Sequence, residues 1–227
     1  MKKSLEDHAA RFDEKAAEYD DSKSEEYRAC AELVIRHAAP EADDVVLDLA
    51  TGTGAIGLAI AENAEFVVGR DISEGMLDQA REKAAERGIE NIAFGEGRFR
   101  DPGVDRDVDV VVSNFAMHHL SDAEKRESIE TIAELEPDRF VLGDVMLFGE
   151  ADPSEPFYSP EVDDPATVGV LADALTDAGF ALTAVEQVHE QVGVLVAERP
   201  GGTVDADAAA ATDADAESGD DADQETE

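Results

Sequence analysis

Apolar residues follow two alternating patterns along most of this chain. Short apolar runs of strand length alternate with longer segments in which apolar residues recur every three or four positions, as in helices. We expect strands at 44–50, 65–70, 91–94, 108–113 and 139–147, and helices at 54–63, at 73–87, after Ser121 and at 166–178. This alternation favours a doubly wound α/β sheet that is mainly parallel.

The last two apolar runs of this core have a different connection. They lie at 180–188 and 191–198, which leaves no room for a helix between them. Such spacing predicts an antiparallel hairpin. The predicted core, residues 41–200, is therefore a Rossmann-like sheet of about seven strands that ends in an antiparallel hairpin.

Three segments fall outside this alternation. Helical spacing over 4–38 predicts two helices, so residues 1–40 form an N-terminal helical cap. Residues 148–165 are rich in proline and too long for a plain connection, which suggests a lid. Residues 201–227 have no aromatic residue and many acids, so we expect a disordered acidic tail.

The charge is unusually negative and is not confined to one end. The chain has 56 acids against 18 Lys and Arg, a net charge of −38. The tail holds ten of the acids and no base, so residues 1–200 retain a net charge of −28. Binding to a basic partner is one explanation. Adaptation to molar salt is the other, and the spread of acids over every predicted helix favours it. In this respect the chain resembles proteins of extreme halophiles, which implies a high-salt cytoplasm.

This explanation predicts that salt stabilises the fold. Lowering the salt from molar to low concentration should lower the melting temperature, because repulsion between the acids is no longer screened. Thermal unfolding followed by circular dichroism at the two salt concentrations measures the effect. A transition that does not move between them would contradict the halophilic interpretation.

Composition also excludes several classes of protein. A single cysteine, Cys30, excludes an internal disulfide and a multi-cysteine zinc site. No apolar run reaches the roughly 18 residues of a membrane span, and no signal-peptide pattern follows Met1. No basic stripe offers a site for nucleic-acid phosphates. We therefore expect a cytoplasmic protein that binds neither membrane nor nucleic acid.

The junction between the first strand and its helix indicates a ligand site. Residues 45–57 read as a strand, a glycine turn and the start of a helix, and Asp71 closes the next strand. Gly52-x-Gly54-x-x-Gly57 fits the dinucleotide fingerprint, a short pattern that also occurs by chance. Asp71 has the spacing of a carboxylate that accepts hydrogen bonds from ribose hydroxyls. Together these features predict a crevice for a nucleotide-like cofactor.

Two motifs give the chain a family resemblance over about residues 10–198. Phe12-Asp13-x-x-Ala16-x-x-Tyr19-Asp20 and Asp48-x-Ala50-x-Gly52-x-Gly54 resemble the motifs of class I S-adenosylmethionine-dependent methyltransferases of the small-molecule type. Ala50 stands where the family usually has its first glycine. A methyl group is tolerable there if the residue does not have positive φ.

The resemblance implies S-adenosylmethionine as the cofactor and assigns residues to it. Asp71 would bind the ribose, Ile72 the adenine face and Glu96 the adenine amine, although the family usually has aspartate at that last position. Asn114 would border the transferring methyl group, and Tyr19 would close over the cofactor. The complete predicted set is Tyr19, Asp48, Ala50, Gly52, Gly54, Asp71, Ile72, Glu96, Gly97 and Asn114.

Histidines offer a further candidate function. His118 and His119 lie in a connector that resembles a family segment in which histidines are often structural, and a general-base role for either one stays open. The other three histidines, His8, His37 and His189, have no ligand spacing, so we expect no metal.

The acceptor is expected to be a small molecule bound under the 148–165 segment, because the Asn-Pro-Pro-aromatic motif of base methylation is absent. Two other functions remain open. A nicotinamide (NAD) oxidoreductase would share the glycines, but an acid directly before the turn is unusual there and the hairpin would be unexplained. A non-catalytic module with a methyltransferase-like fold could instead bind a partner through its acidic surface.

Overall fold

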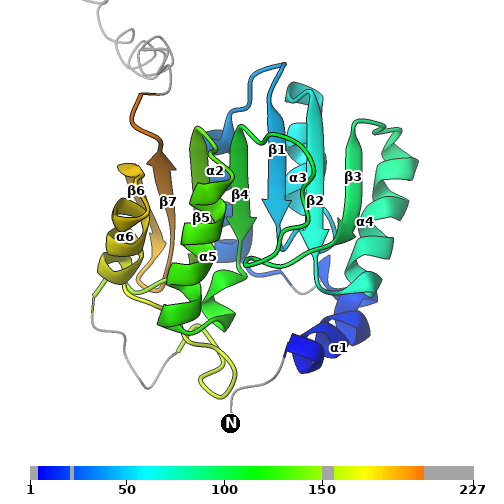
Figure 1. Ribbon diagram of the computed structural model, residues 1–227. Helices are drawn as coiled ribbons and strands as arrows, with labels where there is room; N and C mark the ends of the chain where they lie inside the picture. The colour runs from blue at the N-terminus through cyan, green and yellow to red at the C-terminus, as the bar shows by residue number, and fades with distance from the viewer. Residues whose placement is uncertain (1–4, 21–22, 150–155, 202–227) are drawn as a thin grey trace, which may run out of the picture.

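The computed structural model describes residues 5–20, 23–149 and 156–201, and its described strands form one seven-stranded sheet (Figure 1). The spatial order is β3-β2-β1-β4-β5-β7-β6. The strands are β1 Val45–Leu49, β2 Phe66–Asp71, β3 Ile92–Glu96, β4 Val110–Asn114, β5 Arg139–Val145, β6 Ala181–His189 and β7 Val192–Glu198. The predicted disordered tail lies, from residue 202 onward, outside the described residues.

Helices connect β1 to β2, β2 to β3 and β4 to β5, whereas a loop without a helix joins β3 to β4. The α-helices are α1 Leu5–Lys15, α2 Glu25–Ala38, α3 Ala55–Ile60, α4 Glu74–Arg87, α5 Asp122–Glu134 and α6 Val168–Asp177. Short 3-10 turns are η1 Ala16–Glu18, η3 Ala61–Asn63 and η4 Met117–His119. Ser73 caps α4 and Gly88 ends it at φ 67°, while Ser121 and Glu124 form a capping box on α5. None of the described helices is long and apolar enough to cross a membrane.

The strand directions confirm the predicted topology. β1, β2, β3, β4 and β5 are parallel neighbours, whereas β7 is antiparallel to both β5 and β6. The predicted Rossmann-like sheet with a terminal antiparallel hairpin is therefore confirmed.

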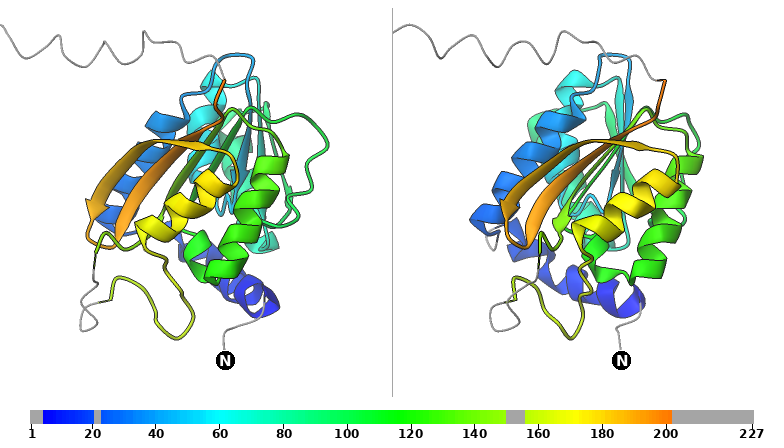
Figure 2. Two further views of the ribbon diagram at one scale, coloured as in Figure 1. Left: turned by 60° about the vertical axis from the view of Figure 1, so that its left-hand side comes forward. Right: turned by 90° about the vertical axis from the view of Figure 1, so that its left-hand side faces the viewer.

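Alternating strand residues face two separate cores. Leu47 and Val111 belong to the core under α5 and α6, whereas Val46, Val110 and Val112 face α2 and α3. The edge-on view shows these helices on opposite sides of the sheet (Figure 2). Burial on both faces explains why these strands are continuous apolar runs in the sequence.

The N-terminal segment lies across the end of the sheet where the parallel strands finish (Figure 1). Two acids of the opening motif attach it there. Asp13 Oδ1 accepts hydrogen bonds from Ser73 Oγ at 2.6 Å and from Gly75 N at 2.9 Å. Asp20 Oδ1 accepts one from Thr53 Oγ1 at 2.7 Å, and Asp20 is also paired with Lys83. The division of the chain into a cap and a core at residue 40 stays a prediction.

Candidate functional site

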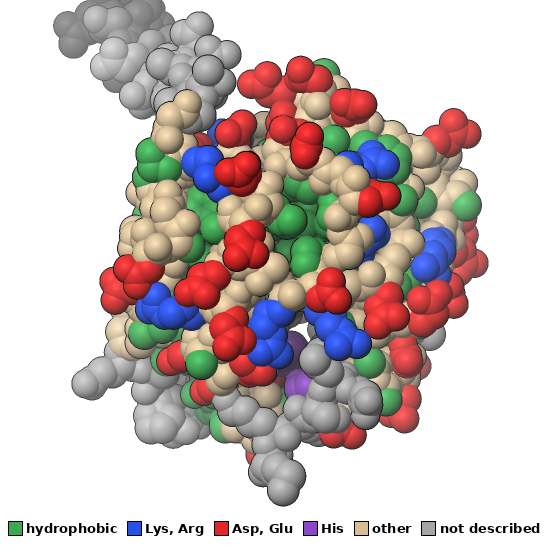
Figure 3. Space-filling model, in the orientation of Figure 1, with side chains coloured by type: hydrophobic (Ala, Val, Ile, Leu, Met, Phe, Trp, Pro, Cys, Tyr) green, Lys and Arg blue, Asp and Glu red, His purple; other side chains and the backbone are tan. Residues whose placement is uncertain are grey.

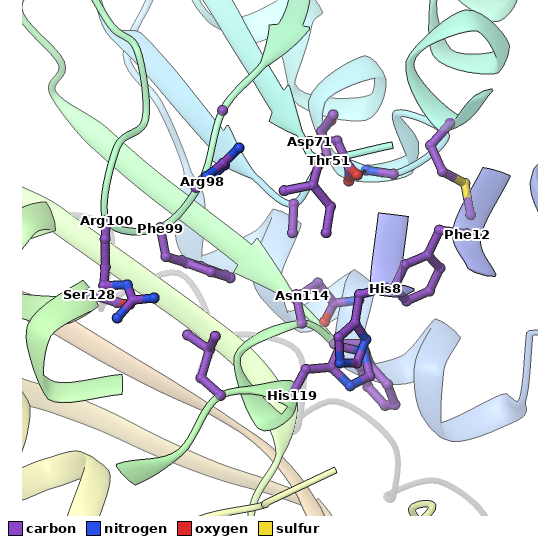
Figure 4. A pocket seen from close by; sticks show the side chains of 18 of the residues that line it. His8, Phe12, Thr51, Asp71, Arg98, Phe99, Arg100, Asn114, His119 and Ser128 are labelled. Atoms are coloured by element: carbon purple, nitrogen blue, oxygen red, sulfur yellow. Dashed lines mark hydrogen bonds between the residues drawn. The ribbon is translucent and has the colours of Figure 1, made fainter. Parts of the chain in front are cut away.

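A cavity of about 440 Å³ opens at the carboxyl ends of the parallel strands. Histidine side chains are visible through an opening on one face of the molecule, with basic side chains beside it (Figure 3). Figure 4 shows how the lining residues converge from the glycine turn, α1, the segment after β3 and the connector after β4. They are His8, Phe12, Tyr19, Tyr27, Ala50, Thr51, Gly52, Asp71, Ile72, Met76, Gly97, Arg98, Phe99, Arg100, Asp101, Asn114, Phe115, Ala116, His119, Leu120, Glu124 and Ser128.

Asp48 supports the glycine turn from behind and does not line the cavity. Its Oδ2 accepts hydrogen bonds from Thr51 Oγ1 at 2.6 Å and from Gly57 N at 2.9 Å. Burial raises the pKa of Asp48 to about 7, although these two hydrogen bonds oppose the shift. Asp48 therefore acts on the site by fixing the backbone between β1 and α3.

The backbone of the turn is left-handed at several positions. Ala50 has φ 59°, Gly52 φ 55° and Gly54 φ 82°. Alanine is tolerable at position 50 only if its φ is not positive, and the observed φ does not meet this condition. A Cβ in this region meets the following carbonyl oxygen, so Ala50 is strained at a position where the motif that it resembles usually has glycine.

Ala50→Gly is expected to stabilise the fold. Removing the Cβ relieves about 1–2 kcal/mol of left-handed strain, while the freer unfolded chain takes back about 0.4–1 kcal/mol, which leaves a net gain of up to about 1.6 kcal/mol. Urea unfolding measures the difference. Ala172→Gly is the control, because the same exchange within α6 should cost roughly 0.5–1 kcal/mol. A loss of stability in both variants would contradict the inference that the backbone at Ala50 is strained.

Asp71 is the acid that reaches the cavity. Its Oδ2 accepts a hydrogen bond from Gly52 N at 2.8 Å, and its Oδ1 accepts one from Ser73 N at 2.9 Å. Burial raises the pKa of its carboxyl group above the usual value. Each oxygen keeps a second lone pair, so the side chain can accept hydrogen bonds from a ligand that enters the cavity.

The predicted cofactor residues separate into two groups. Tyr19, Ala50, Gly52, Asp71, Ile72, Gly97 and Asn114 line the cavity, whereas Asp48, Gly54 and Glu96 do not. The Glu96 side chain is 71% exposed and lies 3.5 Å from Arg98 in an exposed ion pair. The structure therefore gives no support for the adenine contact expected of Glu96.

Asn114 presents an amide group to the cavity. The residue is 7% exposed, and its Oδ1 and Nδ2 atoms are buried without a hydrogen bond of good geometry to any described residue. The side chain lies close enough to the Tyr27 hydroxyl to lower the pKa of that group, which burial raises. A buried amide in this condition favours binding of a polar ligand group.

The rings of Tyr19 and Tyr27, near Asn114, both make cation–π contacts with the ammonium group of Lys23. Lys23 Nζ lies 3.5 Å from the ring centroid of Tyr19 and 3.4 Å from that of Tyr27. Burial lowers the pKa of Lys23 to about 7. Both tyrosines line the cavity, and such faces attract a cationic ligand as well. Sequence reasoning did not select Tyr27, because its spacing in α2 is the same as that of core residues.

The two adjacent histidines each pair with an aspartate. His118 Nδ1 lies 2.5 Å from Asp144 Oδ1, and His119 Nδ1 lies 2.6 Å from Asp163 Oδ1. His118 is buried outside the cavity, whereas His119 lines it. Ligand atoms of His118, His119 and Asp163 lie within 4.8 Å of one another, but both Nδ1 atoms are already bonded to carboxylates. The histidines therefore form two hydrogen-bonded pairs, His118 with Asp144 and His119 with Asp163.

The described part of the 148–165 segment does not line the cavity, so the expected position of the acceptor under this segment gains no support from those residues and stays a prediction. The segment instead packs behind the cavity wall, where Asp163 bonds to His119 and the Phe157 ring lies 6.3 Å from that of Phe115. Residues 150–155 lie outside the described residues. Helix α1 provides His8 and Phe12 as the cover that was expected from this segment.

These features fit an adenosyl cofactor that bears a sulfonium. Gly52 leaves the backbone open to the ligand, since the nearest atom to a Cβ built there is Tyr19 Cε1 at 3.9 Å. Asp71 offers acceptors for ribose hydroxyls, Asn114 offers a buried amide, and the Tyr19 and Tyr27 rings offer a face for a cation. The donor and acceptor types therefore match the cofactor expected from the sequence.

Comparisons with known proteins support the same assignment. Residues 46–136 match the model of a methyltransferase domain. An uncharacterized methyltransferase of Geobacillus sp. (strain WCH70) is 34% identical over 146 residues, which cover 61% of this chain and 65% of the relative. Aklanonic acid methyltransferase DauC of Streptomyces sp. (strain C5) is 31% identical over 116 residues, which cover 49% of this chain and 53% of the relative. The chain thus spans between about half and two thirds of these relatives.

A solved structure shares the fold. Magnesium protoporphyrin IX methyltransferase (ChlM) from Synechocystis PCC 6803, with bound S-adenosylmethionine, superposes with a TM-score of 0.59 at 21% identity. The superposition covers 76% of this chain and 79% of that one. The chain therefore has a Rossmann-like fold of the kind found in methyltransferases, and residues 46–136 match the model of a methyltransferase domain.

Proposed function

We propose that this protein transfers a methyl group from S-adenosylmethionine to a small-molecule acceptor. The observation that carries the proposal is the convergence of Asp71, Gly52 and Asn114 on one cavity at the carboxyl ends of the strands. This edge of an open α/β sheet is where such folds bind their ligands. The methyltransferase domain match over this region supports the same reaction.

The main contribution of the residues of this chain is to align the cofactor with the acceptor. The bound cofactor would supply an electrophilic methyl group on a positively charged sulfur. Asp71 would hold the ribose through its carboxylate oxygens and Ile72 would pack on the adenine, while Tyr19 lies over the glycine turn. Holding both reactants in a water-poor cavity provides the proximity on which a direct displacement depends.

The acceptor is a small molecule that enters beside the cofactor. The cavity wall includes the apolar side chains of Phe12, Phe115 and Leu120, together with charged residues such as Arg100 and Glu124. A cavity of about 440 Å³ suits ligands of this class rather than a polymer. One of the similar curated proteins is named for such an acceptor, aklanonic acid.

We also propose that the protein works in high salt in the cytoplasm. Acidic side chains are spread over the face that Figure 3 shows, rather than gathered in one patch. A net charge of −38 is strongly self-repelling at low ionic strength. The change in melting temperature with salt tests this part of the proposal.

Isothermal titration calorimetry tests the choice of cofactor. Separate titrations with S-adenosylmethionine, S-adenosylhomocysteine and NAD should give binding heats for the first two compounds only. Binding of NAD alone would favour the oxidoreductase. Binding of S-adenosylmethionine without turnover of any acceptor in a chemically broad panel would favour the non-catalytic module.

A further inference from the structure

His119 is the histidine placed to act on an acceptor. It lines the cavity, and its ring lies 5.1 Å from that of His8 and 5.7 Å from that of Phe12 (Figure 4). His118 packs behind it, with ring centroids 4.1 Å apart, and does not line the cavity. A molecule in the cavity can therefore reach His119 but not His118.

The pairing with Asp163 fixes which ring nitrogen of His119 carries the proton. Although burial opposes the shift, hydrogen bonds from His119 and Ser159 N lower the pKa of Asp163, so this carboxylate is ionised and only accepts. His119 Nδ1 must then be the donor in the 2.6 Å contact. Burial lowers the pKa of the His119 ring, which keeps it neutral near pH 7. The lone pair consequently lies on Nε2.

The second ring nitrogen of His119, Nε2, takes no part in the hydrogen bond with Asp163. Within the described residues, the hydrogen bonds of the His119 side chain are confined to Nδ1. Ionisable groups near the ring include His8 on α1 and His118 and Asp144 behind it, and Glu124 and Arg100 line the same cavity. A neutral imidazole with a free basic nitrogen, oriented by a carboxylate, is the arrangement that general-base catalysis requires.

We infer that His119 is the general base for the acceptor, that Asp163 is its positioning residue, and that the acceptor is an aromatic hydroxyl compound. This inference rests on the proposed function. The aromatic wall formed by Phe12 and Phe115 suits a flat ring, and a neutral hydroxyl carries a proton that must leave during transfer.

The step balances without any further reactant. The acceptor O–H bond breaks and its proton moves to His119 Nε2, while the oxygen electron pair forms the new bond to the methyl carbon. The electron pair of the broken carbon–sulfur bond stays on sulfur, which becomes neutral. The imidazolium later gives its proton to water, so the products are a methyl ether, S-adenosylhomocysteine and one proton.

Ionisation of a bound phenol tests the inference without relying on turnover. The probe is 4-nitrophenol, whose ionised form absorbs visible light, titrated into full-length protein saturated with S-adenosylhomocysteine. An imidazolium partner should lower the apparent pKa of the bound phenol by about 1–3 units relative to the His119→Gln variant. Asp163→Asn should lose part of this shift, because an amide holds the imidazolium less strongly.

His37→Gln is the matched control. His37 Nε2 also pairs with a carboxylate, Glu186 Oε1 at 2.5 Å, but it lies outside the cavity lining. This variant should ionise 4-nitrophenol as the unmodified protein does. With S-adenosylmethionine in place of the product, His119→Gln should lower kcat for methylation of 4-nitrophenol by about 10²–10⁴-fold and leave the KM for S-adenosylmethionine unchanged.

Calorimetry with S-adenosylhomocysteine separates the two ways of failing. Suppose that the unmodified protein and the variants bind S-adenosylhomocysteine equally. If they then ionise 4-nitrophenol to the same extent, or do not bind it, His119 is not the base. If the unmodified protein does not bind S-adenosylhomocysteine, the proposed function itself is wrong.

Discussion

Replacing Asp71 with alanine is expected to weaken binding of S-adenosylmethionine by about 1–3 kcal/mol, roughly five- to 150-fold. The carboxylate accepts hydrogen bonds from Gly52 N and Ser73 N and has lone pairs left for the ribose hydroxyls. The variant removes the proposed ligand contact and also the acceptor for Gly52 N in the turn. Calorimetric titration of both proteins measures the change.

Asp78→Ala provides the control for this loss. Asp78 is an exposed acid on α4 that pairs only with Arg81 among the described residues, so its removal changes the net charge equally without touching the cavity. The affinity of the Asp78→Ala variant for S-adenosylmethionine should equal that of the unmodified protein. Equal affinities in all three proteins would mean that Asp71 does not bind the ribose.

Asp48→Asn is expected to stabilise the protein above neutral pH. Burial raises the pKa of Asp48 to about 7, from 3.8 in the unfolded chain. Between these two values the folded state binds the extra proton, so the free energy of unfolding falls as pH rises and levels off above pH 7. Asparagine keeps an acceptor for Thr51 Oγ1 and Gly57 N but has no charge to bury.

The size of this effect follows from the span of pH that is tested. From pH 5.5 to 8.5 the unmodified protein should lose about 2 kcal/mol through Asp48, whereas Asp48→Asn should not. Chemical unfolding at the two pH values gives the difference. Thr51→Val, which removes one hydrogen bond but keeps the acid, should retain the pH dependence. Parallel pH profiles for the unmodified protein and Asp48→Asn would show that Asp48 titrates normally.

The order of the elements could be predicted from the sequence because apolar spacing records burial directly. Strands such as β4 are buried on both faces and appear as unbroken apolar runs, while Ser73 and Ser121 mark the starts of helices through their own side chains. The hairpin of β6 and β7 followed from the short connection alone. These signals are local, and local signals survive without knowledge of tertiary contacts.

Parts of the site depend on contacts that a local pattern does not contain. Asp163 reaches His119 from 44 residues away along the chain, and Tyr27 enters the cavity from a helix whose apolar spacing resembles a core stripe. The exposure of Glu96 depends on how the segment after β3 leaves the sheet. The positive φ of Ala50 is a backbone property that its side chain gave no reason to expect.

A crystal structure of the complex with S-adenosylhomocysteine tests the central claim most directly. We expect the ribose hydroxyls within hydrogen-bonding distance of Asp71, the adenine against Ile72, and the sulfur toward Asn114 and the Tyr19 ring. A cavity that stays empty in crystals grown with saturating S-adenosylhomocysteine, or a ligand bound elsewhere on the protein, would contradict the account.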